Sequence, residues 1–439
     1  MYTIHPAEES TRWLSEPLKC VDLDAYERGL LDGAAGEAAA LAMRVIVETG
    51  RVLGATSLVE IRSAHIDGCL YHGDSGTLFA ERLVGLGARV AVPTTLNVGA
   101  LDLLHGGLVR LEPAARKMAH RLMAAYIAMG ARQTWTCAPY QAGHRPAAGE
   151  DVAWGESNAV AFCNSVLGAR TNRYGDFLDI CAAITGRAPK SGLHLPQNRL
   201  ATVLIDATGV PESFWRDDIA FPILGAWLGR AVGQRIAAIE GIGRPTEDQL
   251  KALGAAAASS GSVGLFHVIG VTPEAPTRSA AFGGVPPEDT IRLDLTALTR
   301  ARASLSTVNR SAGEAIDAVA IGSPHLSTDE LHALDRLVGQ RNCSKPLYAC
   351  TGRHALAGLP QGLMQSLNDR GVVVIVDTCI VVTPVLPSGS GVLVTNSGKF
   401  AHYAPQNTGY DVVFATLVEC VESAVRGSLY LTPDGAHES

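Results

Sequence analysis

Residues 371–379, GVVVIVDTC, join an uninterrupted β-branched run to an abrupt polar ending. Such a run is typical of a strand that is buried on both faces of a parallel sheet. A similar change from an apolar run to polar residues occurs in 317–325 (DAVAIGSPH), 345–352 (KPLYACTG) and 391–398 (GVLVTNSG). Open parallel sheets hold their ligands beyond the carboxyl ends of their strands. The four segments therefore predict strand ends that converge on one cleft.

Helical patterns alternate with strand patterns along most of the chain. Residues 25–49 carry alanine, leucine and glutamate at helical spacing, and Gly50 follows as a stop signal. Further helices are expected at 73–87, 220–240 and 327–341, and further strands at 57–66, 88–97, 200–207 and 262–270. This alternation predicts an α/β fold with parallel, doubly wound sheets, arranged in several lobes around a central cleft.

Composition excludes several classes of protein. The chain has 439 residues, 47% of them hydrophobic and 18% charged, which is enough to bury a large core. Its formal net charge of -7, without a long basic run, argues against a nucleic acid partner. No uninterrupted apolar segment is long enough for a membrane span, and no secretory signal begins the chain, so we expect a cytoplasmic protein. Nine scattered cysteines without a CxxC pair argue against a disulfide framework.

A polar cluster in the middle of the sequence predicts a binding site. Cys137 lies in TCAPYQAGHRP (136–146), and Glu156, Arg170, Asn172 and Arg173 follow within a short distance. Arg170 and Arg173 could clamp a carboxylate or phosphate, or be solvated charges at an exposed helix end. Glu156 could pair with one of these arginines or take part in proton transfer.

His325, in GSPH, also has two interpretations: it could act as a base, or it could simply be hydrogen-bonded at a strand end. The Pro/Gly-rich stretch 272–288 is the expected linker between lobes. It separates a region at 25–271 from a region at 289–430, with an N-terminal extension at 1–24.

The chain resembles the large catalytic part of aconitase X. The resemblance is carried in order by AHIDGCLYHGDSGTLF, RVAVPTTLNVGALDL, the Cys137 block through GARTNR, ITGRAPKSGLHL, AVAIGSPHLSTDEL, VVVIVDTCIVVTP and TNSGKFAHYAP. It covers roughly residues 25–430 and implies an α/β fold with lobes around an iron-sulfur cluster. It also implies dehydration of either cis-3-hydroxy-L-proline or mevalonate 5-phosphate.

The resemblance further implies a partner. Family members carry a small swivelling domain, fused or as a separate subunit, and the matched blocks leave no room for it in this sequence. We therefore expect a large subunit that binds a small swivelling-domain subunit. In the superfamily a serine of that domain is expected to remove the substrate proton.

Three loops resemble the cluster-binding positions of the family and indicate Cys137, Ser323 and Cys379 as metal ligands. The family pattern often has cysteine where this chain has Ser323, and serine is a harder, rarer ligand than thiolate. The cluster could therefore be a [2Fe-2S], [3Fe-4S] or [4Fe-4S] type, Cys69 could replace the missing thiol, or the chain could lack a cluster.

The remaining blocks provide candidates for contact with a small-molecule hydroxy acid substrate. Lys399 would add a point charge for its anionic end, and Lys399 and His325 are the catalytic candidates. The substrate-binding candidates are Asp74, Ser75, Thr94, Thr95, Asn97, Glu156, Ser157, Arg170, Asn172, Arg173, Ser397, His402 and Tyr403.

The leading hypothesis is cis-3-hydroxy-L-proline dehydratase, favoured by an Ala-, Gly- and Arg-rich composition typical of GC-rich bacterial genomes. Mevalonate 5-phosphate dehydratase is the alternative, and more basic residues in the cleft would favour it. The alternative from another class is a non-catalytic iron-sensing or binding subunit.

Overall fold

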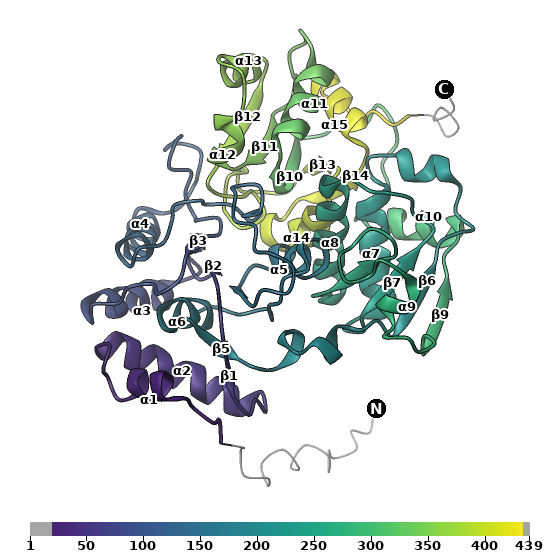
Figure 1. Cartoon of the computed structure of the whole chain (residues 1–439). Coiled ribbons are helices and arrows are strands. Elements are labelled where there is room, and N and C mark those ends of the chain that lie inside the picture. The colour runs from purple at the N-terminus through teal and green to yellow at the C-terminus, as the bar shows by residue number, and fades with distance from the viewer. Residues whose placement is uncertain (1–19, 433–439) are drawn as a thin grey trace, which may run out of the picture.

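The computed structural model describes residues 20–432, so most of the N-terminal extension expected at 1–24 lies outside the described residues. Between these limits the chain forms helices and four sheets, grouped in three regions (Figure 1). The strands pair in parallel, except for the antiparallel pair of β1 (Leu58–Glu60) and β5 (Arg187–Pro189). The predicted α/β class with parallel sheets is confirmed.

The first region, purple to blue in Figure 1, contains a three-stranded sheet in the order β3-β2-β4. Helices α3 and α4 pack against each other, as do α2 and α6. The elements are α1 (Ala25–Leu31), α2 (Glu37–Val52), β2 (Ala64–Ile66), α3 (Asp74–Gly85), β3 (Thr94–Leu96), α4 (Pro113–Ala128), β4 (Ala153–Trp154), α5 (Ser157–Phe162), the π-helix η2 (Cys163–Leu167), α6 (Leu178–Thr185), and the 3-10 turns η3 (Gly192–His194) and η4 (Pro196–Arg199).

The second region, in teal, has the strand order β8-β7-β6-β9. Its helices α7 and α8 approach closely because Gly225 and Gly229 of α7 face backbone of α8, where a Cβ would not fit. The elements are β6 (Val203–Asp206), the 3-10 turn η5 (Glu212–Arg216), α7 (Ala220–Val232), β7 (Ala237–Glu240), α8 (Glu247–Gly261), β8 (Phe266–Val268), α9 (Arg278–Ala281), β9 (Asp289–Arg292) and α10 (Leu295–Ala303).

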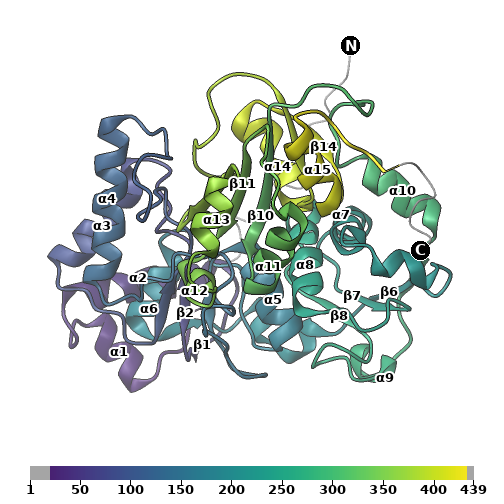
Figure 2. The ribbon, with the colours of Figure 1, turned by 90° about the horizontal axis from the view of Figure 1, so that it is seen from above.

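The third region, green to yellow, has the order β12-β11-β10-β13-β14 and lies between the other two when the molecule is seen from above (Figure 2). Its elements are β10 (Ala318–Leu326), α11 (Thr328–Val338), β11 (Leu347–Thr351), α12 (Arg353–Ala357), α13 (Leu363–Asp369), β12 (Val372–Val376), β13 (Val392–Thr395), α14 (Gly398–Thr408), β14 (Asp411–Phe414) and α15 (Leu417–Arg426). Helix α8 packs against both α5 and α14, so the second region supports the other two.

Three expectations from the sequence are corrected by the structure. The helix expected at 25–49 is two helices, because the chain reverses between them through Gly33 and Gly36, both at positive φ. The end of the helix expected at 220–240 is strand β7, whose apolar residues complete the sheet. The stretch 272–288 does not link two lobes, since it connects β8 to β9 and β9 pairs with β6 of the same sheet.

None of the helices between residues 20 and 432 has the length and apolar character needed to cross a bilayer.

Gly322 provides a test of how tightly β10 and β11 are joined. It has φ +91°, and a Cβ there would overlap the backbone of Cys350. Gly322→Ala is expected to lower the free energy of unfolding by about 3 kcal/mol, because backbone strain and overpacking add. Gly313→Ala, at φ +89° with no atom near its Cβ position, is the matched control and should cost about 1 kcal/mol. Equal losses in urea unfolding would contradict this account.

Candidate active site

A cavity of about 300 Å³ lies between the first and third regions. Its walls come from the ends of strands and from the loops that follow them, as expected for open parallel sheets. The first region contributes Asp67, Leu70, His72, Asn97, Val98, Cys137, Glu156, Ser157, Arg173 and Asp176, and the third contributes Ser323, Cys379, Val381, Val382, Lys399, Tyr403 and Asn407.

The three residues predicted as metal ligands meet at this cavity. Cys137 lies in the loop between α4 and β4, Ser323 lies on β10, and Cys379 follows β12. The predicted convergence is present for the ends of β10 and β12, and Lys399 follows β13 at the same cavity, whereas no residue of 345–352 lines it. Cys69 does not join them: it is fully buried, and its thiol donates to the carbonyl oxygens of Ile66 and Asn97, each at 3.4 Å.

His325 holds these loops together from behind the cavity. Its ring Nε2 lies 3.0 Å from the carbonyl oxygen of Thr378, and its Nδ1 lies 3.1 Å from the hydroxyl of Thr136. Its backbone N–H donates to the sulfur of Cys137 at 3.3 Å. Burial lowers the pKa of His325 to about 3, so the ring is neutral. Because both ring nitrogens are engaged and the residue does not line the cavity, the geometry favours the hydrogen-bonded interpretation over a base.

The two cavity thiols differ in acidity. A hydrogen bond with the Cys350 thiol is the main cause that lowers the pKa of Cys379 to about 7, although burial opposes it. Burial raises the pKa of Cys137 to about 12, although Lys399 opposes the shift. Cys350 was not a sequence candidate. Its signal was its place near the carboxyl end of the buried strand β11.

Lys399, at the start of α14, is paired with the first region. Its Nζ donates to Glu156 Oε1 and to Asn158 Oδ1, each at 2.6 Å. Glu156 also caps α5 by accepting from the N–H of Ala159 at 2.7 Å. Burial favours the neutral amine, but the Glu156 carboxylate outweighs it and raises the pKa of Lys399. Glu156 therefore pairs with Lys399 and not with an arginine.

The expected arginine clamp is not formed. The segment 170–173 is not a helix end but extended chain that pairs with Asp151 and Trp154, so residues three apart do not share a face. Arg173 lines the cavity and makes no ion pair with any residue from 20 to 432, whereas Arg170 does not line it. Asn172 is also turned away: its amide donates to the carbonyl of Ser191 at 3.0 Å and accepts from Leu193 N–H at 2.8 Å.

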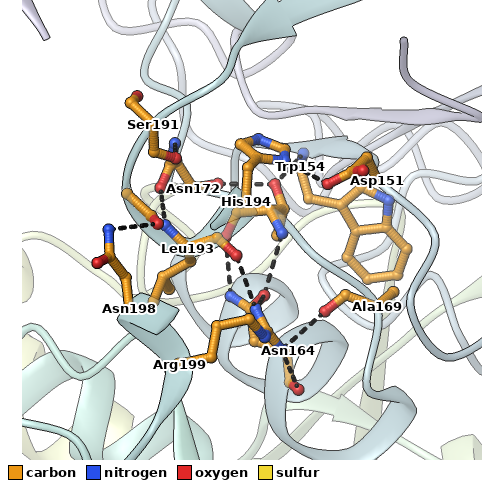
Figure 3. A network of polar contacts seen from close by, with 12 residues as sticks. Asp151, Trp154, Asn164, Ala169, Asn172, Ser191, Leu193, His194, Asn198 and Arg199 are labelled. Carbon is orange, nitrogen blue, oxygen red and sulfur yellow. Dashed lines mark hydrogen bonds and ion pairs between the residues drawn. The ribbon is translucent and has the colours of Figure 1, made fainter. Parts of the chain in front are cut away.

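A buried polar network fixes the backbone beside Arg173 (Figure 3). Asn164 Oδ1 accepts from the Thr171 N–H at 3.0 Å, and its amide donates to the Thr171 carbonyl at 2.9 Å. Arg199 donates to the side chain and carbonyl of Asn164 and to the carbonyl of Ala169. The guanidinium is also paired with Glu274 at 2.7 Å. The network thus holds the main chain while the Arg173 side chain stays exposed.

Other sequence candidates divide into two groups. Asn97, Ser157 and Tyr403 line the cavity with Lys399. The others do not line it, and several have local partners: Thr94 with the carbonyl of Val92, Thr95 with His65 and His144, Asp74 with Tyr71, and Ser397 as the cap of α14, while Ser75 and His402 are exposed.

Two cavity carboxylates, Asp67 and Asp176, were missed by the sequence reasoning. Asp67 lies directly after β2, where a polar residue at a strand end is the available signal. Asp176 lies in the loop before α6, and nothing in its sequence context marks it.

Parallel sheets surround a cavity that holds two thiols, a paired lysine, and two carboxylates with no cation partner among residues 20–432. This arrangement defines an α/β protein with an enzyme-like site. Residues 20–197, 201–303 and 316–426 match the Aconitase X first, second and third domains, respectively. The chain belongs to the aconitase X family, which confirms the predicted resemblance.

Relatives of known function are dehydratases. The chain is 45% identical over 413 residues to the cis-3-hydroxy-L-proline dehydratase of Pseudomonas aeruginosa, covering 92% of this chain and 70% of that protein. It is 41% identical to the protein of the same name from Hypocrea jecorina, covering 96% and 72%. It is 37% identical to the phosphomevalonate dehydratase large subunit of Methanothermobacter thermautotrophicus, covering 90% and 96%.

A solved structure has the same fold. The holo-form of aconitase X from Thermococcus kodakaraensis superposes with a TM-score of 0.81 at 31% sequence identity. The match covers 92% of this chain and 100% of that chain. The multi-lobed, aconitase-like architecture expected from the sequence is therefore confirmed.

Arg199 should be essential for the stability of the Arg173 segment. Arg199→Ala is expected to lower the free energy of unfolding by about 3–5 kcal/mol, because it leaves the buried carbonyls and Glu274 without their partner. Arg216→Ala is the control. That arginine also pairs with a glutamate, but the two side chains are 76% and 86% exposed, so the loss should stay below about 1 kcal/mol. Similar unfolding midpoints for the two variants would contradict the assignment.

Proposed function

We propose that this chain is the large subunit of a hydro-lyase that removes water from cis-3-hydroxy-L-proline. Two relatives with this name are 45% and 41% identical to the chain. The family relationship supports dehydration in general, and the charges of the cavity support this substrate.

The charge balance of the cavity is the observation that carries the choice. Lys399 is matched by Glu156, which leaves Arg173 as the basic cavity residue without a counterion among the described residues. Asp67 and Asp176 face the same space. A phosphate dianion needs several cations, whereas a zwitterionic amino acid brings one carboxylate for an arginine and one ammonium for a carboxylate. The arrangement therefore favours hydroxyproline over mevalonate 5-phosphate.

The donor atoms fit an iron centre with few thiolates. Cys137, Cys379 and Ser323 would hold it, since their side chains belong to one cavity and thiolates are preferred iron ligands. Among residues 20–432 no group of three cysteine, histidine or acidic side chains is placed to bind a metal ion, and the two cavity thiols are joined by the Ser323 hydroxyl as a third candidate ligand. When bound, the centre would supply a Lewis acid for departure of the hydroxyl.

The chain's own residues would bind and orient the substrate. Arg173 would pair with the substrate carboxylate, and Asn97 and Tyr403 would contribute hydrogen bonds from opposite regions of the cavity. The base that removes the substrate proton would come from a small swivelling-domain subunit. Coverage of 96% of a protein named as a large subunit supports such a partner. The cytoplasmic location and the absence of a nucleic acid partner stay predictions.

Turnover of hydroxyproline tests the proposal. The chain, combined with its small partner and loaded with iron without oxygen, should release a pyrroline carboxylate precursor from cis-3-hydroxy-L-proline and leave mevalonate 5-phosphate unchanged. Formation of product is followed by mass spectrometry. Turnover of mevalonate 5-phosphate and not of hydroxyproline would show that the proposed substrate is wrong. Iron binding without turnover of either compound would favour a non-catalytic binding subunit.

Iron content gives a second prediction. Cys137→Ala is expected to abolish the visible absorption and the bound iron, because one of the two cavity thiols is removed. Cys163→Ala is the matched control, since Cys163 is buried in η2 and does not line the cavity. Iron retained in full by Cys137→Ala would exclude that residue as a ligand.

A further inference from the structure

Asp67 is held at the cavity by its main chain. Its N–H donates to Asp179 Oδ2 at 2.7 Å, and the N–H of Gly68 donates to the same oxygen at 3.0 Å. Asp179 lies on α6 and is fully buried. The hydrogen bonds to buried Asp179 therefore fix the main chain of the turn after β2. The fixed main chain sets the direction in which the Asp67 side chain leaves the turn.

Only one oxygen of the Asp67 carboxylate accepts a hydrogen bond from the described residues. Its Oδ1 accepts from the Asn97 amide at 2.5 Å, while no residue from 20 to 432 donates to Oδ2. Glu156, the neighbouring cavity carboxylate, instead accepts from Lys399 and from the N–H of Ala159. Asp176 is exposed and can be solvated by water. Asp67 is thus the sheltered carboxylate of the cavity with an oxygen left to accept a hydrogen bond.

We propose that Asp67 binds the ring ammonium of the substrate and so selects an amino acid over an uncharged analogue of the same shape. The inference rests on the proposed function, because only hydroxyproline of the two candidate substrates carries an ammonium. The ammonium N–H donates to Oδ2, while Arg173 pairs with the carboxylate of the same molecule. Asp67 is a specificity-determining residue in this scheme and transfers no proton.

Ionisation of Asp67 makes the selection depend on pH. Burial raises the pKa of Asp67 to about 6, and the negative charge of Glu156 adds to the shift. Above this pH the carboxylate is charged and binds an ammonium; below it the neutral acid binds an ammonium weakly. The titratable and charged groups that face Asp67 or share its cavity are Cys69, His72, Cys137, Glu156, Arg173, Asp176, Asp179, Cys379, Lys399 and Tyr403.

Two ligands separate the ammonium from the rest of the substrate. L-Proline carries it, and tetrahydrofuran-2-carboxylate has the same ring size and carboxylate with an oxygen in its place. Titration calorimetry on the full chain with its small partner should show Asp67→Asn weakening L-proline about tenfold to a hundredfold, because a charge-assisted hydrogen bond is lost. Binding of tetrahydrofuran-2-carboxylate should change less than about twofold.

Asp369→Asn is the matched control. It makes the same chemical change at an exposed carboxylate that does not line the cavity, and both ligands should bind as they do to the unmodified protein. An equal loss for both ligands in Asp67→Asn, or no loss for either, would overturn the inference. Asp67→Asn could weaken only L-proline binding in a protein that dehydrates no hydroxy acid. That result would support Asp67 as an ammonium-binding residue and would exclude the proposed function.

The unmodified protein gives an independent measurement that needs no variant to fold. Affinity for L-proline should fall as the pH is lowered through about 6, where Asp67 takes up its proton, and should level off at the loss expected for Asp67→Asn. Asp179 supports the turn that carries Asp67, and Cys379 lies on another wall of the cavity, so a change in the ionisation of either should affect both ligands. If the affinity for tetrahydrofuran-2-carboxylate fell to the same extent over this pH range, the effect would come from those groups and not from Asp67.

Discussion

The site depends on the hydrogen bonds that His325 makes to two other loops. The cavity is built by strands from different sheets, and among residues 20–432 no strand pairing joins those sheets. His325 joins the loops instead, together with a main-chain hydrogen bond from Gly99 to Asp377: its ring contacts Thr136 and Thr378, and its N–H donates to Cys137. A neutral ring suits this task, because it can accept at one nitrogen and donate at the other.

Charge in the cavity is distributed unevenly. Lys399 and Glu156 neutralise each other and join α14 to α5, so their main effect is to hold the third region against the first. Arg173 and Asp67 are left for a ligand, and each is fixed through its main chain, one by the Asn164 network and the other by Asp179. Rigid supports fix the main chain from which both side chains extend before a ligand arrives, which reduces the backbone entropy lost on binding.

The sequence predicted the parts of the fold that depend on local pattern. The β-branched runs of β10 to β13 indicated buried parallel strands, and their polar ends indicated the cavity. Local pattern failed where contacts join residues that are distant in the sequence. Residues 237–240 form strand β7 because they pair with β6. Glu156 pairs with Lys399, which lies more than 200 residues later in the chain. Spacing misled at Arg170, because the segment is extended and not helical.

The wide separation of Cys137 and Cys379 along the chain has a consequence for biosynthesis. The Cys137 loop leaves the ribosome first, and the strand that carries Ser323 follows much later, with Cys379 after it. A nascent chain therefore offers iron a single thiol of the pair, too few donors for stable capture. The iron centre proposed for these residues would therefore form only after the last sheet has docked, so metal loading would be a late step that reports completed folding.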